Sequence, residues 1–150
     1  EGTGVAFTAK LLICDVVTVT MMDTVLQAAK AMKASGTGCI VVVENNKPVG
    51  MFSERDLLSR VVAPGLDPAK TLVETAMTPN PVCADCSEPL EKVFSTLAEG
   101  RFRHLPITDN GSLVGIVSIH DLAKVLAKVL KQEEYVEYFA DYIQRSSSPA

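Results

Sequence analysis

The chain has 150 residues, of which 47% are hydrophobic and 21% charged, and its formal net charge at pH 7 is -4. This composition excludes a disordered chain, and the acidic balance argues against a general nucleic-acid binder, which needs a basic footprint. No run reaches the roughly 18 apolar residues of a membrane span, and the N-terminus shows no basic-then-apolar leader pattern. We therefore expect a folded, cytoplasmic protein with no nucleic-acid or membrane partner.

The first elements expected along the chain form one β-α-β-β-α unit. The central helix is amphipathic and ends at Gly36, and the apolar run that follows is typical of a strand covered on both faces. Asn45-Asn46 predicts a tight turn before the returning strand. In chain order, the elements are predicted at 9–12 (short helix), 16–19 (strand), 24–34 (helix), 39–43 (strand), 49–52 (strand) and from 54 onward (helix).

A repeat with a spacing of 65 residues organises the chain. The shift places Asn45 on Asn110 and Gly50 on Gly115. The matching elements of the second unit are predicted at 73–77, 81–84, 90–99, 104–109, 113–117 and from 119 onward. We therefore predict a mixed α+β fold of two repeats with pseudo-two-fold symmetry. Because one unit of about 60 residues is marginal in size, we expect the two to share a core.

The predicted boundaries follow from the repeat and from composition. They are 8–62 for the first repeat, 63–72 for the inter-repeat loop, 73–130 for the second repeat, 131–145 for a C-terminal helical extension and 146–150 for a disordered tail. The last helix carries an apolar stripe beyond the length that the repeat needs. We expect this extension to pack on its own module, to mediate dimerisation or to dock on a partner.

Two seven-residue segments, GMFSERD at 50–56 and GIVSIHD at 115–121, share a Gly-x-x-Ser-x-x-Asp pattern. Ser at a strand end, three residues before an acid, is typical of a capping box, in which both side chains satisfy backbone N–H groups. The same geometry suits a ligand, because a helix N-terminus favours a phosphate and a carboxylate accepts from ribose hydroxyls. Capping alone leaves the leading Gly of both segments unexplained, and both interpretations stay open on the sequence.

The four cysteines include the pair Cys83-x-x-Cys86. A zinc site would need two further ligands, and Cys14 and Cys39 do not form a second pair. A redox pair should open a helix, where the thiol pKa is lowered, whereas Cys83 lies in an expected strand. No Walker sequence, Gly-rich dinucleotide loop or Ser-His-Asp order is present either. We expect buried, reduced cysteines, no metal site, no required cofactor and no catalytic activity.

The two Gly-x-x-Ser-x-x-Asp segments, AMTPNPV at 76–82 and FRHLPITDNGSLVG at 102–115, make the chain resemble a tandem pair of cystathionine-beta-synthase-type (CBS) domains, or Bateman module. The resemblance covers about residues 8–130. It implies a regulatory module that binds AMP, ADP, ATP or S-adenosylmethionine in clefts between the repeats. It also implies a homodimer and an unknown regulated protein, and it leaves open whether Mg²⁺ accompanies the phosphates.

The resemblance also implies roles for particular residues. In that family the motif Asp holds the ribose hydroxyls and the motif Ser lies near the phosphates, and residues at the starts of two strands line the adenine. By position, the ribose and phosphate residues are Asp56, Asp121, Ser53 and Ser118, and the adenine residues are Thr18, Thr20, Gly38, Cys39, Cys83, Ala84, Arg103 and His104. Arg55 and His120, inside the motifs, add cationic partners for phosphate.

The repeats differ in the charge around their motifs. Arg101, Arg103, His104 and His120 gather near the second motif, whereas Arg55 is the obvious phosphate partner of the first. We therefore expect unequal sites, with the Asp121 site preferring the more phosphorylated ligand. The competing hypothesis is a ligand-free interaction or dimerisation module in which both Ser-x-x-Asp motifs are only helix caps.

Overall fold

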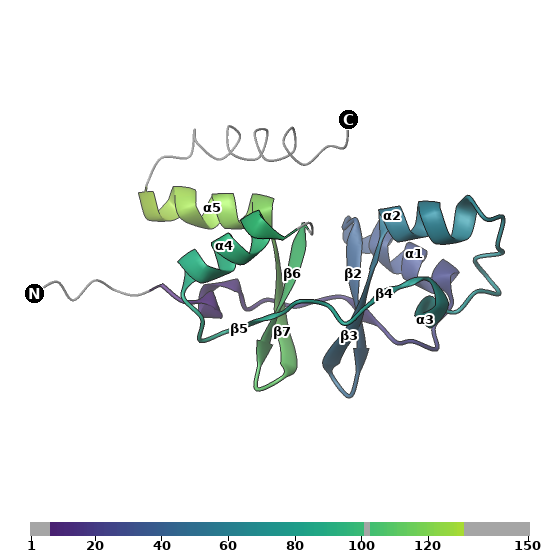
Figure 1. Cartoon of the computed structure of the whole chain (residues 1–150), viewed down its shortest axis with the longest axis horizontal. Coiled ribbons are helices and arrows are strands. Elements are labelled where there is room, and N and C mark those ends of the chain that lie inside the picture. Colours follow the sequence, from purple (N-terminus) through teal and green to yellow (C-terminus); the bar gives the residue numbers. More distant parts are fainter. Residues whose placement is uncertain (1–6, 101–102, 131–150) are drawn as a thin grey trace, which may run out of the picture.

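The computed structural model describes residues 7–100 and 103–130. Figure 1 shows two halves side by side, each with a small sheet and its helices, and two chain segments that cross from one half to the other. The predicted helical extension at 131–145, the tail at 146–150 and Arg101 lie outside the described residues. The predicted mixed α+β fold is confirmed.

The first half contains a four-stranded sheet in the order β1-β2-β3-β4. β1 is parallel to β2, and the remaining neighbours are antiparallel. The strands are β1 (Thr18–Val19), β2 (Cys39–Glu44), β3 (Lys47–Ser53) and β4 (Thr78–Pro79), and the helical elements are α1 (Val25–Ser35), α2 (Glu54–Leu57), the π-helical turn η2 (Leu58–Val62) and α3 (Val73–Ala76).

The second half repeats this arrangement with a three-stranded sheet in the order β5-β6-β7. β5 is parallel to β6, and β6 is antiparallel to β7. The strands are β5 (Ala84–Asp85), β6 (His104–Asp109) and β7 (Ser112–Ser118), and the helices are α4 (Leu90–Glu99) and α5 (Ile119–Leu130), with the 3-10 helix η1 (Ala9–Leu12) contributed by the N-terminal segment. Both first strands are shorter than predicted.

The turns and helix ends follow from local sequence. Thr24 and Gln27 form a capping box at the start of α1, and Gly36 ends that helix in the left-handed conformation with a φ of 68°. Asn45 and Asn46 both have positive φ, as do Asn110 and Gly111. This conformation at both central residues gives the twist that a tight β-hairpin turn requires.

The two halves have separate cores, so the expectation of a shared core is wrong. The first core is built from α1, β2, β3 and η2, and it includes Val73 and Ala76 of α3. The second is built from α4 and β5–β7, and it includes Ala9 and Leu12 of η1. The short helix that leads each repeat in sequence therefore packs on the core of the other half. This exchange couples the halves through apolar burial.

The leading Gly of each motif has a packing reason. Gly50 pairs with Pro79 of β4, and Gly115 forms an isolated bridge with Ile13. A Cβ at Gly115 would collide with the carbonyl oxygen of Leu12, and one at Gly50 would collide with the Met77 thioether. Each glycine thus allows the crossing segment to lie directly against the strand. Ligand binding is not needed to explain the repeated Gly.

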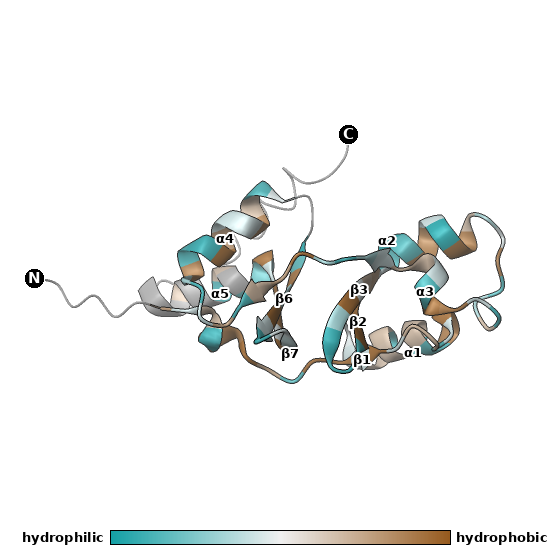
Figure 2. Ribbon diagram, turned by 60° about the horizontal axis from the view of Figure 1, so that its bottom comes forward, coloured by the Kyte–Doolittle hydropathy of each residue, from teal (hydrophilic) through white to brown (hydrophobic). Residues whose placement is uncertain are grey.

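Helix α4 and the helix that begins with α2 carry hydrophilic and hydrophobic residues together, which Figure 2 shows as teal and brown on the same ribbon. The strand β2, by contrast, is buried over its first four residues. This pattern is that of helices packed on a sheet through one face. Among the described residues, no helix combines the length and the apolar character needed to span a membrane.

Candidate functional site

Both Ser-x-x-Asp motifs lie where a strand ends and a helix begins. The first residue of the preceding strand pairs with the motif serine in both repeats, Cys39 with Ser53 and His104 with Ser118. The register therefore brings together the predicted residues of the second strand and of the motif in each half. The crossing segments pair with the same strands, β3 and β7, at the leading glycines Gly50 and Gly115.

Both motifs form capping boxes. In the first, the Asp56 N–H donates to Ser53 Oγ at 3.2 Å, and the Ser53 N–H donates to Asp56 Oδ2 at 3.0 Å. In the second, the Asp121 N–H donates to Ser118 Oγ, and the Ser118 N–H donates to Asp121 Oδ2, both at 3.1 Å. The local geometry that capping predicts is therefore present in each repeat.

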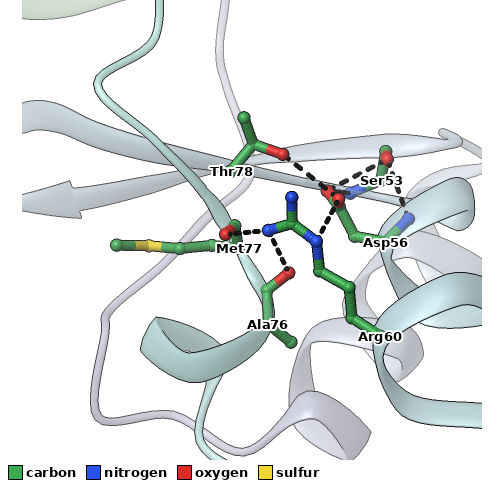
Figure 3. Close-up of polar contacts among 6 residues, drawn as sticks. All are labelled: Ser53, Asp56, Arg60, Ala76, Met77 and Thr78. Carbon is green, nitrogen blue, oxygen red and sulfur yellow. Dashed lines mark hydrogen bonds and ion pairs between the residues drawn. The ribbon is translucent and has the colours of Figure 1, made fainter. Parts of the chain in front are cut away.

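The Asp56 carboxylate has further partners, which together form the Asp56 cluster of Ser53, Asp56, Arg60 and Thr78 (Figure 3). The Ser53 hydroxyl donates to Oδ2 at 3.1 Å, and the Thr78 hydroxyl donates to Oδ1 at 3.1 Å. Arg60 Nε lies 3.8 Å from Oδ1. Asp56 is only 7% exposed, so these donors replace the water that the carboxylate loses on burial.

Arg60 also holds the chain that crosses between the halves. Its guanidinium donates to the carbonyl oxygens of Met77 at 2.6 Å and Ala76 at 3.4 Å (Figure 3). These carbonyls lie at the end of α3, immediately before β4. A cation bonded to the last carbonyls of a helix satisfies acceptors that have no partner within the helix. The Asp56 cluster therefore ties the crossing segment to the start of α2.

The second motif differs from the first in the donors to its aspartate and in the residues of its crossing segment. Asp121 is exposed, and the Ser118 N–H is the donor that the described residues supply to its carboxylate. In the second half the Cys14 N–H donates to the Val114 carbonyl oxygen, as the Asn80 N–H donates to the Val49 carbonyl oxygen in the first half. The two crossing segments are therefore equivalent with residue 14 at the place of residue 80, and Leu12 lies at the place of Thr78. A leucine has no hydroxyl to donate. The position matching Arg60, 65 residues on, is Val125.

A group of charged and titratable residues surrounds His104. Burial lowers the pKa of His104, and the nearby Arg103 cation acts in the same direction, whereas the charges of Asp121 and Glu54 oppose the shift. Glu54 belongs to the first repeat, so the start of β6 faces the start of α2 across the two halves. The predicted residues Arg103, His104 and Asp121 therefore lie within electrostatic reach of one another.

The remaining predicted residues are more dispersed. Four of them are exposed, namely Thr18, Thr20, Arg55 and His120. Gly38 immediately precedes β2, and Ala84 is the first residue of β5. The Thr20 N–H donates to Asp23 at 2.8 Å. Within the described residues, no hydrogen bond joins Thr18, Thr20 or Cys83 to either motif. Gly38 accepts from the Glu54 N–H at 2.9 Å, which links its carbonyl to the first turn of α2.

The four cysteines form no disulfide, and Cys39 and Cys86 are buried, whereas Cys83 is half-buried and Cys14 is exposed, so the expectation of burial is wrong for Cys14. Burial, with the nearby Asp56 charge, raises the pKa of Cys39 to about 12, and burial raises the pKa of Cys83 as well. Such thiols remain protonated at neutral pH and are poor nucleophiles. Within residues 7–100 and 103–130, no three His, Cys, Asp or Glu side chains are grouped as metal ligands.

Sequence reasoning missed Arg60 and Thr78. Arg60 was detectable, because a basic residue four positions after an Asp on a helix is a common ion-pair spacing. Thr78 lies 22 residues away from Asp56, and its contact depends on how the segment at 76–82 crosses the first half.

A shallow cavity of about 420 Å³ between α1 and α2 includes Gly38 and Glu54 in its lining, but not Asp56.

Comparison with known proteins decides the family, because the CBS domain family model matches residues 9–63 and 73–128. The chain belongs to the CBS-domain family. It is 42% identical over 105 residues to CBS domain-containing protein CBSCBSPB1 of Arabidopsis thaliana, covering 69% of this chain and 19% of that protein. It is 38% identical over 108 residues to CBS domain-containing protein YhcV of Bacillus subtilis, covering 72% and 76%.

Solved CBS structures are similar in fold. The CBS-domain containing protein ATU1752 from Agrobacterium tumefaciens matches with a TM-score of 0.66 and 36% identity, covering 74% of this chain and 89% of that one. The CBS domain protein PAE2072 from Pyrobaculum aerophilum, complexed with AMP, matches with a TM-score of 0.72 and 27% identity, covering 83% and 96%. The chain spans less than a fifth of the length of the first curated relatives.

Proposed function

We propose that the chain is a regulatory, non-catalytic module that binds an adenine nucleotide in a cleft between its two CBS repeats. The observation that carries this proposal is the repeated grouping of a strand's first residue with a motif Ser and Asp at a helix start, in a family with an AMP-complexed relative. A carboxylate accepts from vicinal ribose hydroxyls, and helix N–H groups favour a phosphate.

The charge around the second motif supports a phosphorylated ligand there. Arg103 and His104 lie beside Asp121, and a bound phosphate would add a negative charge that favours the protonated imidazole. We propose that the Asp121 site prefers the more phosphorylated nucleotides. Occupancy would be passed to a regulated protein or to a second copy of this chain in the cytoplasm, to the extent that the ligand prefers one arrangement of the repeats.

A thermal-shift screen tests the proposed ligand class. AMP, ADP, ATP and S-adenosylmethionine are compared, each with and without Mg²⁺, with cytidine monophosphate as the control for the base. At about 100 times Kd a bound ligand adds about 2.7 kcal/mol to the free energy of unfolding. That corresponds to a rise of about 5–11 °C for a chain of this size. No rise with any adenine ligand would contradict the proposal.

A ligand-free interaction module is the second candidate, and the complete capping box in each repeat favours it. An Asp121→Ala variant separates the two functions. A nucleotide sensor loses its ligand-induced thermal shift while its ligand-free melting temperature falls little. A module with caps alone shows a modest destabilisation of about 1 kcal/mol or less and no ligand effect on either protein.

A further inference from the structure

We propose that only the second motif accepts a ribose, so that one chain binds one nucleotide, with Asp121 as the acceptor and Asp56 as a structural residue. This inference rests on the proposed function and goes further than a difference in affinity between two sites. It depends on how many acceptor positions each carboxylate has left, on the burial of each carboxylate, and on the segment that crosses beside it.

An ionised carboxylate offers about four lone-pair positions on its two oxygens. At Asp56 the Ser53 N–H and hydroxyl donate to Oδ2 and the Thr78 hydroxyl donates to Oδ1, while the Arg60 cation lies 3.8 Å from Oδ1 as an ion pair. Three of the four positions are therefore filled by hydrogen bonds within the chain, and one is left for the two hydroxyls of a ribose diol. A ribose diol could bond Asp56 through both hydroxyls only by displacing one of these donors, and a displaced buried donor costs free energy.

The burial of Asp56 also opposes ribose binding at the first motif. Asp56 is 7% exposed and lies under the end of the α3–β4 segment that Arg60 holds at Met77 and Ala76. Binding a ribose at Asp56 would require this segment to move away from the start of α2. The segment also contributes Met77 to the first core, so its displacement would expose apolar surface.

Asp121 has the opposite properties. Its side chain is exposed, and the described residues donate a single hydrogen bond to it, from the Ser118 N–H. The crossing segment of this half presents Leu12 in place of Thr78, and Leu12 is buried in the second core. The Asp121 carboxylate therefore keeps acceptor positions for both hydroxyls of a ribose diol.

The helices that follow the motifs also differ. α5 has 12 residues of α-helix, whereas α2 has 4 residues before the π-helical turn η2. Both motifs still lie at the start of a helix, because η2 continues the helical backbone of α2 to Val62. The charges beside the motifs differ, because Arg103 and His104 lie beside the second motif and Cys39 takes the place of His104 in the first repeat.

Isothermal titration calorimetry of the whole chain with AMP tests this inference. We expect a stoichiometry near one AMP per chain. Asp121→Asn should weaken AMP binding roughly 10- to 100-fold, the loss expected for hydrogen bonds to a charged acceptor. The matched control is Asp109→Asn, which removes an exposed carboxylate at the other end of β6 and should leave Kd within about twofold, because this residue lies outside the site. Circular dichroism melting checks that both variants fold.

The possible results separate the two proposals. A stoichiometry near two, or a full-affinity site that persists in Asp121→Asn, overturns the single-site inference and leaves the proposed function standing. A chain that binds no AMP, ADP or ATP contradicts the proposed function and the inference with it. One site that Asp121→Asn removes and Asp109→Asn retains supports both.

Discussion

Two aspartates in equivalent sequence positions have different surroundings in this protein. Asp56 is buried and accepts from Ser53 and Thr78 beside the Arg60 cation, whereas Asp121 is exposed. We expect Asp56→Asn to lower the free energy of unfolding by about 2 kcal/mol, and Asp121→Asn to lower it by less than about 1 kcal/mol. In thermal unfolding the first variant should melt about 4–8 °C below the wild type. Equal losses in the two variants would refute the assignment of Asp56 as a structural residue.

The half-buried His104 gives the stability a pH dependence. Burial lowers its pKa from the ordinary value of 6.5, so between the lowered pKa and pH 6.5 the unfolded chain binds more protons than the folded one. The free energy of unfolding should therefore fall as pH decreases through about 6.5. Urea denaturation at pH 7.5 and 5.5 measures this dependence. His104→Gln should reduce the difference in the free energy of unfolding between the two pH values, with His120→Gln as the control. An unchanged difference in His104→Gln would refute the assignment of this pH dependence to His104.

At the scale of elements, a glycine begins each motif because a crossing segment lies directly against the strand at that position. In Gly115→Ala the new methyl group meets the Leu12 carbonyl, which belongs to the backbone, whereas in Gly50→Ala it first meets the flexible Met77 side chain. We expect Gly115→Ala to cost about 2–3 kcal/mol and Gly50→Ala about 1 kcal/mol. Chemical denaturation of the two variants checks the order. A Gly115→Ala protein as stable as the wild type would contradict this explanation.

Most elements could be predicted from local sequence, because caps, turn residues and hydrophobic periodicity act within a few positions. Gly36 ended α1 and the Asn45-Asn46 and Asn110-Gly111 pairs formed the hairpin turns as predicted. β4 was missed, because two residues that pair with a distant strand leave no periodic pattern. The first strands were predicted too long for the same reason, since only two residues of each pair with a neighbour.

The candidate site could be predicted only where it is local. The motif residues and the strand starts are brought together by one hairpin, so their proximity followed from the repeat. The partners of Asp56 could not be found in this way. Thr78 reaches it through a crossing segment, and the Leu12 that replaces Thr78 in the second half lies 66 residues earlier, not 65. A fixed 65-residue shift therefore hides the difference between the motifs.

At the scale of the molecule, the exchange of leading helices determines which fragments fold. The first core contains residues from Val19 to Met77, and it includes neither Ala9 nor Leu12. We expect a fragment of residues 15–80 to unfold cooperatively, because it holds the whole first core. A fragment of residues 1–66, matched in length, lacks α3 and should not. Circular dichroism melting of both fragments checks this, and a cooperative transition in residues 1–66 alone would contradict the described exchange.

The central claim is that one adenine nucleotide lies between the repeats with its ribose on Asp121. A crystal structure of the whole chain grown with AMP tests it most directly. We predict one AMP per chain, its ribose hydroxyls bonded to Asp121, its phosphate near Ser118 and Arg103, and the Asp56 cluster unchanged. A ribose bonded to Asp56, or AMP bound outside the space between the repeats, would contradict the claim.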